Sequence, residues 1–89
     1  MNDKLTDLRK EVDKIDENII TLLAKRMEII KKIGTLKKVH GLVLLDEKRW
    51  QDVLSSRITK AQSLTLSAAF VKRIFNLIHE QSLEIEKEI

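Results

Sequence analysis

The chain has 89 residues, 43% of them hydrophobic and 35% charged, with 17 Lys and Arg against 14 Asp and Glu and a net charge of +3. It contains no Cys, which excludes a disulfide framework, a thiolate nucleophile and a cysteine-ligated zinc site. The small positive excess is a weak footprint for nucleic acid and no apolar run could span a membrane, so we expect a soluble, cytoplasmic protein with neither as partner.

The near absence of Gly and Pro, with abundant Lys, Glu, Leu and Ile, predicts an all-α protein. Composition breaks at residues 39–41 and 61–65 divide the single expected domain, residues 1–89, into three helices over approximately residues 3–39, 46–60 and 67–88. Short polar side chains that can cap a first turn stand near each predicted start, namely Asn2 or Asp3, Asp46, and Thr65 or Ser67.

The first helix carries a heptad seam, because its apolar residues recur at alternating steps of three and four. The seam consists of Leu5, Leu8, Val12, Ile15, Ile19, Leu22, Arg26, Ile29, Ile33 and Leu36. One member is therefore an arginine. A second stripe runs beside the seam, formed by Ile20, Leu23, Met27, Ile30 and Gly34. The middle of this helix must be covered by more than one neighbour.

The length of the first helix predicts an assembly. At about 1.5 Å per residue it is roughly 55 Å long, whereas a compact monomer of this size has a radius of gyration of about 12 Å. Two short helices cannot cover such a stripe, and a chain of this length is near the limit for an isolated core. We expect an intertwined homodimer with the two long helices antiparallel. The alternative is a break or kink in the first helix.

Antiparallel pairing would bring distant cations together. Arg9 and Lys37 are separated by 28 positions with Leu23 at their midpoint, which is about 42 Å along one helix. Pairing centred on Leu23 places Arg9 of one chain level with Lys37 of the other, and Arg26 lies about 16 Å from Lys37 on the adjoining seam. Three cations would then meet at one anion site per chain. Alternatively, Arg26 pairs with an internal acid or extends to water, and Arg9 and Lys37 belong to a solvated face.

Five segments of the sequence resemble the all-helical, type II chorismate mutases in order and separation. They are residues 8–17 (LRKEVDKIDE), 22–26 (LLAKR), 33–37 (IGTLK), 46–49 (DEKR) and 78–82 (IHEQS). The resemblance implies an intertwined homodimer of three-helix chains, with two active sites shared between the subunits. It also implies the Claisen rearrangement of chorismate to prephenate in aromatic amino-acid biosynthesis. That reaction is unimolecular and pericyclic, so no cofactor or metal is expected.

The resemblance also implies roles for individual residues. Arg26 and the partner subunit's Arg9 would bind the two carboxylates, for which a guanidinium fork is suited. Lys37 would face the ether oxygen and a carboxylate, and Asp46 would meet the ring hydroxyl. The ring-carboxylate end would be lined by Arg49 and Ser82. Simpler readings remain open: an N-cap for Asp46, a surface cation for Arg49 and a small packing residue for Ser82.

Two positions depart from the pattern of the best-known bacterial members. Glu86 stands where those have a glutamine that faces the ether oxygen. An ionised carboxylate would repel the developing oxyanion, so Glu86 could help only when protonated, and we expect activity to favour acidic pH. Trp50 stands where many members have a glutamate, and its indole cannot accept a hydrogen bond. Glu86 could instead face solvent, and Trp50 could pack in the core or cover the ring.

Other functions are weighed on the same residues. An isochorismate pyruvate-lyase would use a similar cationic pocket on the same scaffold, and a non-catalytic helical interaction or regulatory module would need none. His40 and His79 lie in separate segments without a third suitably spaced ligand, so no metal site is expected. The chain could be free-standing, or fused to or associated with a synthase of the shikimate pathway.

Overall fold

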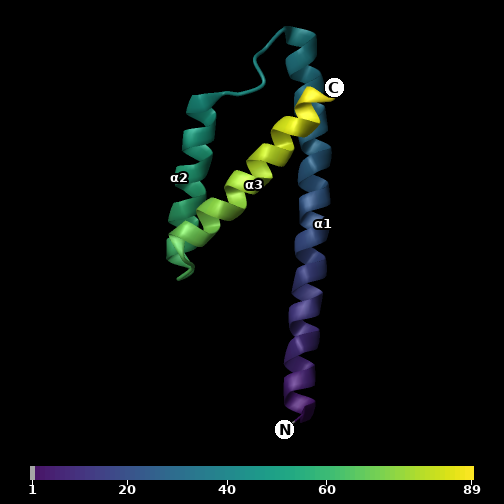
Figure 1. The fold of residues 1–89 in the computed structure, drawn as a ribbon, viewed down its shortest axis with the longest axis vertical. Helices are drawn as coiled ribbons and strands as arrows, with labels where there is room; N and C mark the ends of the chain where they lie inside the picture. Colours follow the sequence, from purple (N-terminus) through teal and green to yellow (C-terminus); the bar gives the residue numbers. More distant parts are fainter. Residues whose placement is uncertain (1) are drawn as a thin grey trace.

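The computed structural model describes residues 2–89 and is helical, with no strand in that part of the chain. The three helices are α1 (Asn2–His40), α2 (Glu47–Ser63) and α3 (Ala68–Lys87), as Figure 1 shows. The predicted all-α fold with three helices is confirmed, and every helix end lies within three residues of its predicted place. No helix among the described residues is both long and apolar enough to cross a membrane.

Two of the predicted N-caps are present. The Asp46 Oδ1 atom accepts a hydrogen bond from the Arg49 backbone N–H at 3.0 Å, and the Ser67 Oγ atom accepts one from the Phe70 N–H at 3.2 Å. Each satisfies a first-turn N–H that has no partner within the helix. Asp3 lies inside α1, and the side chain of Asn2, the other residue predicted to cap α1, lies outside the described part.

Helices α1 and α2 both end in the same hydrogen-bonded turn. After α1, Leu42 N–H donates to the Lys37 carbonyl at 2.8 Å and Gly41 takes a φ of +65°. After α2, Leu66 N–H donates to the Ala61 carbonyl at 2.9 Å and Thr65 takes a φ of 57°. Glycine adopts this left-handed conformation freely, whereas threonine is strained by about 1–2 kcal/mol. The first turn leads into the 41–46 loop, which connects α1 to the start of α2 (Figure 1).

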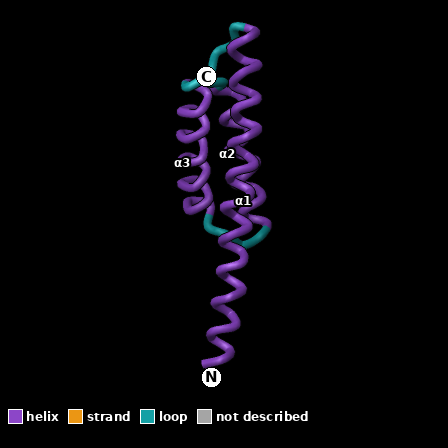
Figure 2. The backbone as a smooth tube through the Cα atoms, turned by 90° about the vertical axis from the view of Figure 1, so that its right-hand side faces the viewer, coloured by secondary structure: helices purple, strands orange, loops and turns teal. Residues whose placement is uncertain are grey.

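The helices form an open, elongated arrangement. Helix α3 packs against both α1 and α2, and α1 and α2 do not pack directly against each other. The N-terminal half of α1 extends past the other two helices as an isolated rod (Figures 1 and 2). The radius of gyration is 16.8 Å and the dimensions are 59 × 25 × 15 Å, well beyond a compact chain of this length at about 12 Å.

One chain buries little apolar surface. The buried hydrophobic residues are Val53, Ala61 and Val71, all on α2 and α3. In contrast, the apolar residues of the α1 seam are exposed along the whole helix, from Leu5 at 48% through Leu22 at 62% to Leu36 at 58%. Within residues 2–89, no surface covers this apolar stripe.

Helices α1 and α3 cross very closely at Gly34. A Cβ atom at this buried position would lie 2.7 Å from Ile89 Cδ1 and 3.3 Å from the Cα atom of Glu86. The absence of a side chain therefore lets the end of α3 rest on α1. This contact places Glu86 beside Lys37, which lies one turn further along α1.

Candidate active site

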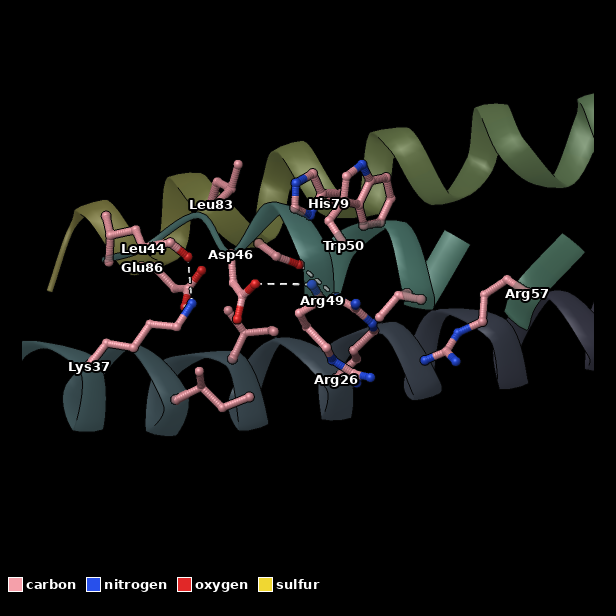
Figure 3. A pocket seen from close by; sticks show the side chains of 14 residues that line it. Arg26, Lys37, Leu44, Asp46, Arg49, Trp50, Arg57, His79, Leu83 and Glu86 are labelled. Atoms are coloured by element: carbon pink, nitrogen blue, oxygen red, sulfur yellow. Dashed lines mark hydrogen bonds and ion pairs between the residues drawn. The ribbon is translucent and has the colours of Figure 1, made fainter. Parts of the chain in front are cut away.

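A pocket of about 230 Å³ lies between the three helices and the 41–46 loop (Figure 3). Its charged lining side chains are Arg26, Lys37, Asp46, Arg49, Arg57 and Glu86. With the neutral Ser82, the pocket brings together every residue predicted for the site except Arg9. Four cations and two acids leave a net charge of about +2 on its walls.

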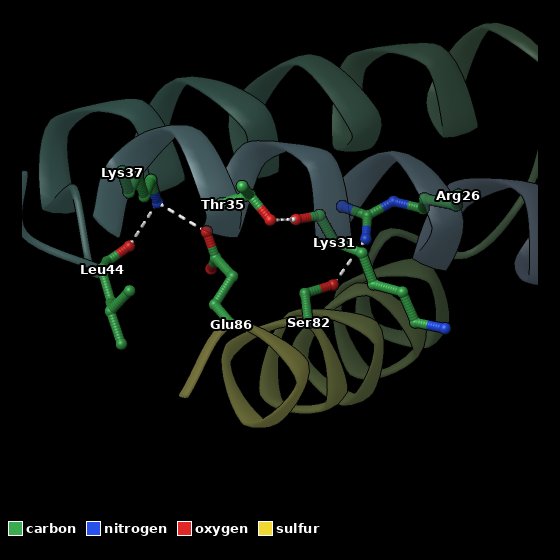
Figure 4. A network of polar contacts seen from close by, with 7 residues as sticks. All are labelled: Arg26, Lys31, Thr35, Lys37, Leu44, Ser82 and Glu86. Carbon is green, nitrogen blue, oxygen red and sulfur yellow. Dashed lines mark hydrogen bonds and ion pairs between the residues drawn. The ribbon is translucent and has the colours of Figure 1, made fainter. Parts of the chain in front are cut away.

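Arg26 is held by a serine rather than by an acid. Its Nη1 atom donates to Ser82 Oγ at 2.6 Å (Figure 4), and the Ser82 hydroxyl donates in turn to the Ile78 carbonyl at 2.7 Å. Ser82 is buried on α3, so the hydroxyl fixes the guanidinium without neutralising it. Among the described residues Arg26 forms no ion pair, and the predicted alternative of an internal acid is not observed.

Lys37 bridges the loop and the end of α3. Its Nζ atom donates to the Leu44 carbonyl at 2.5 Å and lies 2.9 Å from Glu86 Oε1 (Figure 4). The Glu86 carboxylate is 5% exposed, so it does not face solvent. The contact has the distance of an ion pair without hydrogen-bond geometry, and Oε1 is a buried atom with no hydrogen bond in the structure. The Glu86 side chain nevertheless lines the pocket.

Asp46 and Arg49 combine a structural position with a place in the pocket. One oxygen of Asp46 caps α2, while the side chains of both residues line the cavity (Figure 3). The N-cap reading of Asp46 is thus confirmed, and its second oxygen is not needed for the cap. The Arg49 side chain lies in the pocket wall rather than on a remote surface.

Sequence reasoning missed the contribution of Arg57 and His79, and left Trp50 undecided. All three line the pocket, and the Trp50 indole stacks on the His79 imidazole with ring centroids 3.8 Å apart and planes 9° apart. Helical spacing could have found them. Arg57 lies eight positions after Arg49, and His79 three before Ser82, so each shares a face with a residue that was predicted.

The cationic environment perturbs two groups. Burial lowers the pKa of the Arg26 guanidinium, and the like charges of Arg57 and Arg49 lower it further, although an arginine remains charged at neutral pH. Burial also lowers the pKa of His79, with Arg26 as the next cause. Glu47 and Glu86 oppose this shift. Anion binding is the chemistry that this positive potential favours.

Arg9 lies away from the pocket of its own chain. It is an exposed residue on the projecting half of α1, 17 positions before Arg26, a separation of about 25 Å along the helix. Its predicted place in the site of the other subunit stays a prediction. Within residues 2–89 no three His, Asp or Glu side chains gather as a cation site.

The structure is that of an all-α chain of three helices, one of them very long, with a predominantly cationic pocket where the helices meet. The sequence profile of the chorismate mutase type II family matches residues 8–87. The chain belongs to this family.

The chain is similar to curated proteins and to a solved structure. It is 31% identical over 84 residues to the T-protein of Haemophilus influenzae, covering 94% of this chain and 22% of that protein. It is 33% identical over 79 residues to the bifunctional chorismate mutase/prephenate dehydratase of Escherichia coli, covering 89% and 20%. A conserved hypothetical protein from Pyrococcus furiosus superposes with a TM-score of 0.72 at 37% identity, covering 93% and 95%. The chain spans about a fifth of the length of these two curated relatives.

Proposed function

We propose that this chain is a chorismate mutase, which converts chorismate to prephenate by an intramolecular Claisen rearrangement. The observation that carries the proposal is the part-buried Arg26 guanidinium, held by Ser82 with no acid to neutralise it. A charge taken out of water is costly unless an anion compensates it. The net positive charge of the pocket walls suits a substrate with two carboxylates.

The reaction needs a shaped, charged cage rather than a reactive side chain. One C–O bond breaks while one C–C bond forms in the same molecule, and no proton or group is transferred to the protein. Catalysis then consists of holding the compact conformer and stabilising the negative charge that grows on the ether oxygen. Lys37 supplies a cation for that oxygen, and Glu86 can donate a hydrogen bond to it when protonated.

The remaining residues hold the ends of the substrate. Arg26 grips one carboxylate, and Arg49 and Ser82 line the ring-carboxylate end. Asp46 meets the ring hydroxyl with the oxygen that does not cap α2. None of these roles requires a bond to form between protein and substrate.

We propose that two chains pair antiparallel about Leu23 as a homodimer with shared active sites. The proposal is supported by the exposed apolar seam on the projecting half of α1. It is also supported by the pocket, which lacks only Arg9 from the predicted set. The partner subunit's Arg9 would close each pocket. The relatives named as bifunctional make fusion or association with another pathway enzyme a further proposal, and a cytoplasmic location stays a prediction.

The direct test follows the ultraviolet absorbance of chorismate with purified protein. We expect turnover to prephenate in the wild type, and a loss on the order of a hundredfold or more in Arg26→Ala. Lys25→Ala, at an exposed neighbouring position, serves as the matched control and should keep full activity. Formation of salicylate and pyruvate from isochorismate instead would indicate the lyase. A folded protein that turns over neither substrate would contradict the proposal.

The shared site has its own test. Arg9→Ala and Arg26→Ala chains are each expected to be inactive, but mixed dimers contain one site with both arginines. Random re-association would restore roughly a quarter of the wild-type sites. Unfolding and refolding the two variants together, then assaying the mixture, measures this. Absence of recovery, with dimers present, would show that Arg9 does not act across the interface.

A further inference from the structure

The wall of the pocket formed by α2 and α3 holds a stacked aromatic pair. Trp50 comes from α2 and His79 from α3, and their rings lie nearly parallel at 3.8 Å. Both side chains are partly exposed into the pocket, and Figure 3 shows the pair side by side near Asp46. One face of the imidazole is therefore covered by indole, which fixes the plane of the ring.

His79 is neutral at neutral pH in this setting. Burial lowers its pKa, and Arg26 and Lys37 on α1 add like charge, against Glu47 on α2 and Glu86 on α3. A neutral imidazole carries one N–H donor and one acceptor nitrogen. Among the described residues, no hydrogen bond is formed by either nitrogen of His79.

The other pocket groups cannot offer the same combination. Arginine and lysine side chains and the Trp50 indole only donate, an ionised carboxylate only accepts, and Glu86, when protonated, is committed to the ether oxygen. The Ser82 hydroxyl accepts from Arg26 and donates to the Ile78 carbonyl. His79 is thus the neutral pocket side chain whose donor and acceptor are both uncommitted.

We propose that His79, held in place by Trp50, is a specificity-determining residue that hydrogen-bonds the hydroxyl on the ring of the substrate. The inference rests on the proposed function, whose substrate presents two carboxylates, an ether oxygen and one uncharged hydroxyl. The cationic side chains of the pocket interact with the carboxylates and the ether oxygen. A hydroxyl is best satisfied by a group that can both donate and accept a hydrogen bond, and His79 is such a group in the pocket that Asp46 also lines. Trp50 cannot accept a hydrogen bond from the hydroxyl, but its indole stacks on the imidazole and positions it.

The test compares two substrates with three proteins. The substrates are chorismate and the analogue with hydrogen in place of the ring hydroxyl, and the proteins are wild type, His79→Phe and His79→Gln. Phenylalanine keeps a ring against Trp50 but has no nitrogen, whereas glutamine keeps a donor and an acceptor. We expect His79→Phe to lower kcat/KM for chorismate by about tenfold and to leave the analogue unchanged. His79→Gln should recover part of the preference for chorismate over the analogue that lacks the ring hydroxyl.

Each other result overturns the inference. Equal losses on both substrates would assign His79 a structural role, and no loss on either would remove it from the site. If the wild type turns over neither substrate, the proposed function fails and the inference fails with it. If His79→Phe does not fold, His79→Leu is a second variant without nitrogen. Fluorescence of Trp50, the one tryptophan in the sequence, verifies that the pocket wall is intact.

Discussion

The two halves of α1 differ in what lies beside them, although the heptad seam is exposed in both, with Ile29 at 56% and Leu36 at 58% in the C-terminal half. In the C-terminal half, Gly34 is buried against α3, and Arg26 and Lys37 have polar partners within the chain. In the N-terminal half, Val12 and Ile15 are 54% and 57% exposed with no helix beside them. The pattern therefore indicates which face is apolar, but not whether the covering surface comes from the same chain.

The difference has an energetic consequence. Covering an apolar side chain such as leucine or isoleucine contributes about 1.5–3 kcal/mol, and the projecting half of α1 leaves this contribution unused. The chain alone has a small buried core of Val53, Ala61 and Val71. We infer that the C-terminal half forms the pocket and the N-terminal half brings two pockets together.

The largest effect should come from a charge on the projecting half. Ile15→Asp places a carboxylate on a seam that is exposed in one chain, so a monomer would tolerate it. In the proposed dimer the carboxylate would be buried and unpaired, at a cost of several kcal/mol. We expect dissociation and loss of turnover, measured by sedimentation and the chorismate assay.

Lys10→Asp, on another face of the same half, is the control and should remain dimeric and active. If Ile15→Asp is still dimeric and fully active, the N-terminal half of α1 does not form the dimer interface. The interface would then lie elsewhere.

A smaller effect is expected at Glu86, whose Oε1 atom lies 2.9 Å from Lys37 Nζ on the C-terminal half of α1. The wild-type kcat/KM should rise as pH falls, because only the protonated carboxyl donates to the ether oxygen. Glu86→Gln donates at every pH, so its activity at pH 8 should exceed that of the wild type by on the order of tenfold. Coincident pH profiles for the two proteins would disprove the role given to Glu86.

Gly34→Ala should change the rate by a few fold. The added methyl group meets Ile89 Cδ1, a flexible side-chain end, and the less mobile backbone of Glu86. The end of α3 would shift by a few tenths of an ångström and move Glu86 relative to Lys37. We expect a modest fall in kcat with dimerisation unchanged, because the change lies in the C-terminal half.

Gly41→Ala is the control that separates the fall in kcat expected for Gly34→Ala from a general effect of replacing glycine by alanine. Nothing lies within 4 Å of the Cβ position at Gly41, but its φ of +65° strains any residue with a side chain. It should therefore lower stability by about 1 kcal/mol and change kcat less than Gly34→Ala. The reverse order would show that the crossing at Gly34 does not control the site.

The sequence was informative where local chemistry decides the outcome. Asp46 and Ser67 are short polar residues before apolar runs, and both cap helices. Arg26 and Lys37 follow the register of one helix, so their common face was predictable. The resemblance to a family supplied Ser82 and Glu86, which no local rule brings together with α1.

What could not be predicted depends on how helices cross. The sequence left open a bound anion, an internal acid or water as the partner of Arg26, and the close contact at Gly34 brings Ser82 into reach of it. Trp50 and His79 come from different helices, and only the angle between α2 and α3 places their rings in contact. The place of Arg9 depends on a second chain and stays a prediction.

The smallest expected effect is the pH dependence of stability that comes from His79, which belongs to the pocket rather than to the interface. Burial, and then Arg26, lowers the pKa of His79 below its ordinary value of about 6.5. The unfolded chain therefore binds a proton at higher pH than the folded chain does. The folded state loses stability as the pH falls from above the ordinary value toward the lower folded pKa.

His79→Gln removes the titrating group, so the part of the stability that the folded state loses through His79 as the pH falls should no longer be lost. Urea unfolding midpoints at pH 8 and pH 5.5 measure it, and the wild type should lose more stability between the two than the variant. Because the imidazole faces the pocket of its own chain, the difference should be the same when dimerisation is disrupted by Ile15→Asp. A difference seen only in the dimer would mean that the surroundings of His79 are completed by the other subunit, and that the two halves of α1 are less independent than their environments in one chain indicate.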